Sequence, residues 1–226
     1  MTKTKPEDVL RVYGGSASDV YDDFMLWYFK FVPQTRAAYE EFFEKLELKP
    51  GQEVLEVGVG TGSNIPFYRR DIKFTGIDLT PEMIEVARVN ARFNMKRDAR
   101  LSVEDGAQLP YINDAFDVVT STYNLCVTEN PKQVLHEMIR VCKPGGKIGV
   151  FDYRRANGNP QVAIDQEFLK ETMMQAGLFH NGRAAVVFDP TSDLDQYVTD
   201  CGLEVLHKEV IEGNFTDCAG AYVMRK

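Results

Sequence analysis

The sequence has few cysteines, and nothing in their arrangement makes them a site. Cys126, Cys142, Cys201 and Cys218 form no C-x-x-C pair and lack the histidine spacing that a structural zinc site uses. No cluster of acids and histidines indicates another metal, so we expect no metal centre. Thiols scattered in this way are typical of a reduced compartment, and we predict a cytoplasmic protein.

Long apolar runs and basic runs are also missing. No apolar stretch approaches the roughly 18 residues of a membrane-spanning helix, and residues 1–15 lack the apolar core of a signal peptide. Acidic residues outnumber basic ones by 34 to 26, and the formal charge of −8 disfavours nucleic acid as a partner. We therefore predict no stable membrane insertion, leave peripheral membrane contact open, and find no indication of the oligomeric state.

What the chain does contain is an alternation of strand and helix patterns. Pro50 and Gly51 separate a helical extension, residues 1–48, which we predict to be a lid, from one globular unit, residues 49–226. The clearest helix follows Thr80, a fitting N-cap, and has Met83, Ile84, Ala87 and Ala91 at helical spacing. A second helix begins after Asn130, which we expect to cap it.

The expected strands cover residues 53–57, 72–79, 99–105, 116–124, 147–153, 203–211 and 220–226. Helix patterns separate the first five, so we predict an α/β fold with a doubly wound, mostly parallel seven-stranded sheet. The last two strand patterns are only a few residues apart, which favours an antiparallel pair at the sheet edge. In such sheets ligands bind at the carboxyl ends of the strands.

A glycine-rich loop follows the first strand in the stretch VLEVGVGTG, residues 54–62. Such a loop brings backbone N–H groups close to a ligand, and Asp78, at the end of the next strand, could accept hydrogen bonds from ribose hydroxyls. The alternative, that Asp78 only caps the next helix, stays open. Ser63 stands where a dinucleotide fingerprint needs glycine, and Glu56 precedes the loop, so a ligand with few phosphates and a positive charge fits best.

Four successive stretches between residues 52 and 153, VLEVGVGTG, GIDLTPEM, EDGAQLPYINDAFDVV and VCKPGGKI, resemble signatures of the class I S-adenosylmethionine-dependent methyltransferases. They are most similar to the branch that contains quinone-biosynthesis and phospholipid N-methyltransferases. The resemblance implies the Rossmann-like methyltransferase fold, S-adenosylmethionine as cofactor, and a small apolar or amphiphilic acceptor such as a lipid amine, a quinone precursor or another metabolite. An NAD(P)-dependent oxidoreductase and a non-catalytic S-adenosylmethionine-binding regulator are the alternatives.

The resemblance also implies donor-binding roles for residues at the strand ends. These are Glu56, Gly58, Gly60 and Gly62 for the methionine part, Asp78 for the ribose, Leu79 and Met83 for the adenine ring, Asp105 with Gly106 and Ala107 for the adenine amino group, and Asn124 and Leu125 for the methyl-transfer end.

Methyl transfer is an in-line displacement that needs a general base only if the acceptor must lose a proton. The candidate catalytic residues are Tyr123, Asp152 and His180, together with Tyr21, which we expect near the sulfonium because an aromatic ring favours a cation. Tyr21 belongs to an aromatic segment, residues 20–31, that is apolar almost all round. A helix packed over the sheet edge, a lid that forms the acceptor pocket and a membrane contact are its three interpretations.

Overall fold

The structure is a computed structural model that describes residues 33–94, 98–128, 130–153, 194–211 and 219–226. The predictions for Tyr21, the aromatic segment 20–31 and His180 lie outside the described residues. Among the described helices, none has the length and apolar character that crossing a membrane requires.

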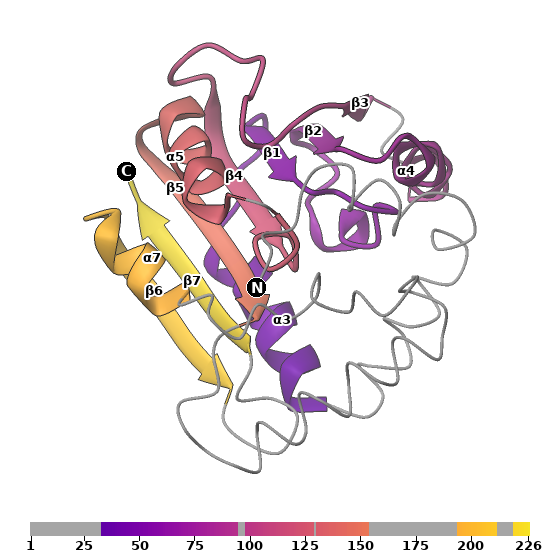
Figure 1. The fold of residues 1–226 in the computed structure, drawn as a ribbon. Coiled ribbons are helices and arrows are strands. Elements are labelled where there is room, and N and C mark those ends of the chain that lie inside the picture. The colour runs from indigo at the N-terminus through magenta and orange to yellow at the C-terminus, as the bar shows by residue number, and fades with distance from the viewer. Residues whose placement is uncertain (1–32, 95–97, 129, 154–193, 212–218) are drawn as a thin grey trace, which may run out of the picture.

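One sheet organises the described part of the chain (Figure 1). Its strands are β1 (Glu53–Val57), β2 (Lys73–Asp78), β3 (Arg100–Val103), β4 (Phe116–Thr122), β5 (Cys142–Tyr153), β6 (Glu204–Ile211) and β7 (Ala219–Arg225). They lie in the order β3-β2-β1-β4-β5-β7-β6; β1 to β5 are parallel, and β7 runs antiparallel to both β5 and β6. The predicted seven-stranded, mostly parallel sheet with an antiparallel edge is confirmed.

Helices cover both faces of this sheet. They are α3 (Pro33–Lys45), the 3-10 helix η1 (Ile65–Phe67), α4 (Pro81–Phe93), α5 (Pro131–Val141) and α7 (Leu194–Asp200). One apolar core joins α3 and α4 to one face, and a second core joins α5 and α7 to the other. Neighbouring residues of β1, such as Val54 and Leu55, enter opposite cores, as strand geometry requires.

The helix α3 is an integral part of the first core. Its side chains Tyr39, Phe42 and Phe43 are buried against the sheet. Gly149 on β5 allows this close approach, because a Cβ there would lie 2.9 Å from the Phe42 ring. The division of the chain into 1–48 and 49–226 stays a prediction, because residues 1–32 lie outside the described part.

The two predicted helix starts differ in how they are capped. Asn130 caps α5 as expected, since its side chain accepts a hydrogen bond from the Gln133 N–H at 3.2 Å. Thr80 occupies the N-cap position of α4 as expected, although its side chain makes no capping hydrogen bond. The Asp78 side chain accepts a hydrogen bond from the N–H of Thr80 itself, at 2.9 Å. The predicted apolar face of α4 is buried.

Candidate active site

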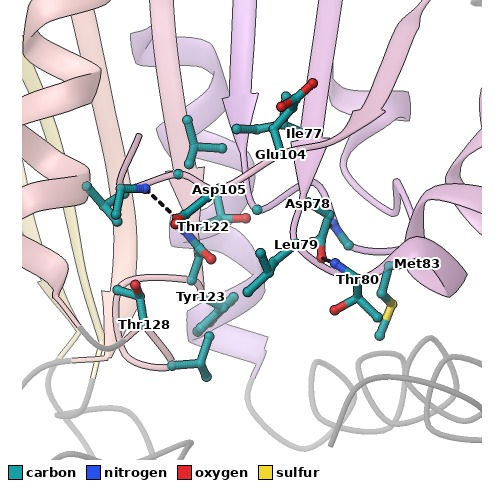
Figure 2. Close-up of a pocket in the computed structure, with 18 of the residues that line it drawn as sticks. Ile77, Asp78, Leu79, Thr80, Met83, Glu104, Asp105, Thr122, Tyr123 and Thr128 are labelled. Carbon is teal, nitrogen blue, oxygen red and sulfur yellow. Dashed lines mark hydrogen bonds between the residues drawn. The ribbon is translucent and has the colours of Figure 1, made fainter. Parts of the chain in front are cut away.

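A cavity opens at the carboxyl ends of β1, β2 and β4, where a doubly wound sheet is expected to bind its ligand (Figure 2). The predicted site residues that line it are Gly58, Gly60, Asp78, Leu79, Met83, Asp105, Gly106, Ala107, Tyr123 and Asn124. Sequence reasoning missed further lining residues, among them Thr80, Glu104, Thr122 and Thr128. The structure therefore brings most of the predicted donor-binding residues to one place.

The remaining predicted residues within the described part lie outside the lining of the cavity. Glu56, Gly62, Leu125 and Asp152 are all buried. A Cβ on Gly62 would lie 2.8 Å from the Ile65 side chain, so this glycine serves the packing of the loop onto η1.

The glycine loop exposes main-chain atoms at the cavity wall. Gly58 has a φ of +77°, and a Cβ there would lie 2.5 Å from Asn124 Oδ1, so only glycine fits beside that side chain. Gly60, with a φ of +54°, would carry a Cβ that meets nothing within 4 Å. The loop thus presents bare main chain to whatever occupies the cavity.

Asp78 joins this loop to the start of α4. Its Oδ2 accepts the Gly60 N–H and its Oδ1 accepts the Thr80 N–H, both at 2.9 Å. Burial raises the pKa of the Asp78 carboxyl, and the amide groups of Thr80 and Gly60 oppose that rise. A carboxylate oxygen has two acceptor positions, so each oxygen keeps capacity for a ligand hydroxyl. Both interpretations of Asp78, helix-start acceptor and ribose acceptor, are compatible with this geometry.

The loop after β3 forms another part of the cavity wall. Asp105 Oδ1 accepts the Ala107 N–H at 2.8 Å, and the Glu104 N–H donates to the Asp78 carbonyl at 2.9 Å. Gly106 allows close packing, since a Cβ there would lie 2.8 Å from Val57. Two acidic side chains, Glu104 and Asp105, therefore stand at this side of the cavity (Figure 2).

Comparison with known proteins identifies the part of the chain that carries this site. Residues 55–150 match a family described as a methyltransferase domain. This part of the chain is similar to a methyltransferase domain. A phosphatidylethanolamine N-methyltransferase of Cereibacter sphaeroides is 32% identical over 51% of this chain and 58% of that one. A demethylmenaquinone methyltransferase of Renibacterium salmoninarum is 28% identical over 75% of this chain and 68% of that one.

The solved structures agree on the fold. A SAM-dependent methyltransferase from Aquifex aeolicus has a TM-score of 0.59 and 18% identity, over 83% of this chain and 89% of that one. The cofactor of this family is S-adenosylmethionine. The site fits it: Gly58 and Gly60 leave a cradle of main chain, and both oxygens of Asp78 in the cavity wall keep capacity to accept a ligand hydroxyl.

The loop after β4 is held by a buried carboxylate. Asp152, only 1% exposed on β5, accepts the N–H groups of Asn124, Leu125 and Cys126 on its Oδ2 at 3.0, 2.7 and 3.4 Å. The preceding residue, Tyr123, has a φ of +48°, which a bulky side chain rarely adopts. Asp152 therefore stabilises the loop that forms one side of the cavity.

A network of hydrogen-bonded polar side chains is buried beneath the glycine loop. The Asn64 amide donates to Glu56 and, at 2.8 Å, to Thr122 Oγ1, while the Tyr39 hydroxyl donates to Asn64 and to Thr122. Burial raises the pKa of Glu56 to about 8, although the hydrogen bonds from Asn64 and Tyr68 act in the opposite direction. Tyr39 and Thr122 are 83 positions apart, and no local sequence pattern could have paired them.

Proposed function

We propose that this protein transfers a methyl group from S-adenosylmethionine to a small apolar or amphiphilic acceptor. The observation that supports it most directly is Asp78, whose carboxylate is fixed by the Gly60 and Thr80 amides at the wall of the cavity. The chain spans 58% of the first relative described above, so activity and acceptor are inferred for it. A lipid amine or a quinone precursor, as in the names of the two relatives, is the acceptor class that we favour.

We propose for these residues the donor-binding roles that the resemblance implies, and the lining of the cavity supports them. We assign the loop between Glu56 and Gly62 to the methionine part, Asp78 to the ribose hydroxyls, and Leu79 with Met83 to the adenine ring. Further assignments are Asp105, Gly106 and Ala107 for the adenine amino group, and Asn124 and Leu125 for the methyl-transfer end. Glu56 and Leu125 would act from behind the wall, because both are buried outside the lining.

The chain's own contribution to the chemistry is mainly to hold two reactants in line. When bound, S-adenosylmethionine supplies an electrophilic methyl group on a sulfonium. Tyr123 lines the cavity and is our candidate within the described residues for proton acceptor or orienter; Tyr21 and His180 stay candidates outside them. We propose that Asp152 acts as a positioning residue for Asn124, because three backbone N–H groups already bond to its Oδ2.

Calorimetry with S-adenosylhomocysteine, the demethylated donor, tests the proposal, with NADH as the comparison ligand. We expect micromolar binding of S-adenosylhomocysteine and none of NADH. Tight NADH binding without S-adenosylhomocysteine binding would instead support the oxidoreductase alternative. A second assay follows transfer of a radiolabelled methyl group to phosphatidylethanolamine in micelles, to a demethylated quinone and to simple amines, phenols and thiols. Binding without transfer to any of these acceptors would indicate a regulatory binding protein.

A further inference from the structure

Tyr39 is the point at which α3 reaches the cavity wall. The side chain is 3% exposed, and its hydroxyl donates to Asn64 and, at 3.1 Å, to Thr122 Oγ1. Its ring lies parallel to that of Tyr123, with a centroid distance of 5.9 Å and an interplanar angle of 19°. It also meets the Phe151 ring edge to face, at 4.8 Å and 78°. One side chain thus contacts two consecutive residues at the end of β4.

Both of those residues line the cavity, whereas Tyr39 does not. Tyr123 adopts a left-handed backbone conformation and needs support from its surroundings to keep it. Its N–H donates to the Phe151 carbonyl at 2.8 Å, and its ring rests on Phe151 and Tyr39. The Thr122 hydroxyl receives two hydrogen bonds, one from Tyr39 and one from Asn64. The wall is therefore stabilised from the side opposite the ligand.

The same group of side chains extends to the glycine loop. Asn64 donates to Glu56, which is wholly buried and stands two residues before Gly58. Tyr39, through Asn64 and Thr122, consequently connects the end of β1 with the end of β4. Both of these neighbouring strand ends contribute residues to the cavity wall.

We propose that Tyr39 is a positioning residue for the donor site: from α3, it holds Thr122 and Tyr123 in the orientation that binds the donor. The inference rests on the proposed function for the identity of the ligand, S-adenosylmethionine. The positioning of Thr122, by contrast, can be measured without any ligand. A residue that acts only on stability would change the folded fraction and leave the affinity of the folded protein unchanged.

The chain supplies a matched control for this idea. Tyr68 is also 3% exposed, and its hydroxyl forms a hydrogen bond of 2.7 Å with Thr120 Oγ1, two residues before Thr122 on β4. Thr120 is buried and does not line the cavity. Tyr39→Phe and Tyr68→Phe therefore remove the same atom from similar surroundings; only the first removes it from a partner in the cavity wall, while the second also removes a hydrogen bond to Glu56, which is buried behind that wall.

The test compares both variants with the unsubstituted protein by thermal unfolding and by calorimetry with S-adenosylhomocysteine. We expect similar decreases in melting temperature, but an affinity about three- to tenfold lower for Tyr39→Phe and within about twofold of the original for Tyr68→Phe. Thr122→Val should weaken binding similarly, and its combination with Tyr39→Phe should be less than additive, because both remove the same hydrogen bond. Equal affinities for the two tyrosine variants would overturn the proposal.

A ligand-free measurement separates this proposal from the proposed function. With ¹³C-methyl-labelled threonine, the Thr122 methyl resonance should shift or broaden in Tyr39→Phe and stay in place in Tyr68→Phe. If the resonance responds in this way but no S-adenosylhomocysteine binds, the proposed function fails and the positioning of Thr122 stands. If binding occurs and the resonance stays in place in Tyr39→Phe, the positioning role fails and the proposed function stands. Should either tyrosine variant fail to fold, Thr122→Val provides the affinity measurement alone, and an unchanged affinity there contradicts the proposal.

Discussion

The buried carboxyl of Glu56 should make the stability of the protein depend on pH in a way that one substitution removes. Burial raises its pKa from 4.5 to about 8, so the folded protein keeps a proton that the unfolded chain releases above about pH 4.5. The stability that protonated Glu56 contributes is fully present below that pH and is lost as the pH rises to about 8. Within this window the free energy of unfolding should fall by about 1.4 kcal/mol per pH unit, to a total of at most about 5 kcal/mol.

Glu56→Gln should remove this dependence. The glutamine keeps an acceptor oxygen for the Asn64 amide and stays neutral at every pH. We expect the variant to match the original protein within about 1 kcal/mol at pH 5 and to be several kcal/mol more stable at pH 8.

Urea unfolding of both proteins, without ligand, at unit steps between pH 5 and pH 8 gives the difference in unfolding free energy directly. Other titrating groups are common to the two proteins and cancel in that difference. A difference that stays constant across the range would refute the reasoning, because it would mean that Glu56 is ionised in the folded protein.

Three further substitutions test individual contacts. Asp78→Asn places an amide N–H against the Gly60 or Thr80 N–H, and calorimetry should show an affinity for S-adenosylhomocysteine about 10- to 100-fold lower; a change within twofold contradicts the ribose role. Gly58→Ala should abolish that binding. Gly51→Ala, with a similar φ of +79° and nothing within 4 Å of the new Cβ, should cost only about 1 kcal/mol of unfolding free energy in urea. Equal effects of the two substitutions would disprove the clash between a Cβ at position 58 and Asn124. Asp152→Ala removes the acceptor of three backbone N–H groups and should lower the unfolding free energy by about 3 kcal/mol. A loss under about 1 kcal/mol would argue against the role of Asp152 in stabilising the loop after β4.

The parts of the fold that local pattern controls could be predicted from the sequence. Met83 and Ala87 are buried as their spacing indicates, because the amphipathic face of a helix is decided by neighbours along one chain segment. The helix after the glycine loop is one short 3-10 turn with Pro66 in its first turn, a position that proline tolerates. Asp78 and Asp105 reach the same cavity because parallel strands all end at one edge of the sheet.

The parts that depend on distant contacts could not be predicted. β5 begins at Cys142 and not at Lys147, because Cys142 pairs with Phe116 on β4 before the register shifts. The N-cap position of Thr80 could be predicted, but the lack of a capping hydrogen bond from its side chain could not. The hydrogen bonds that join Tyr39 to Thr122 depend on where α3 lies against the sheet, which no periodicity reports.

The place of β7 in the sheet has a consequence for the order in which the chain can assemble. β6 precedes β7 along the chain, yet within the described residues its only strand partner is β7, which itself pairs with β5. During synthesis, β6 therefore emerges from the ribosome before there is a strand for it to join. Until β7 follows, the nascent protein exposes an open edge at β5 and a solitary strand, the kind of surface through which partly folded chains associate with one another.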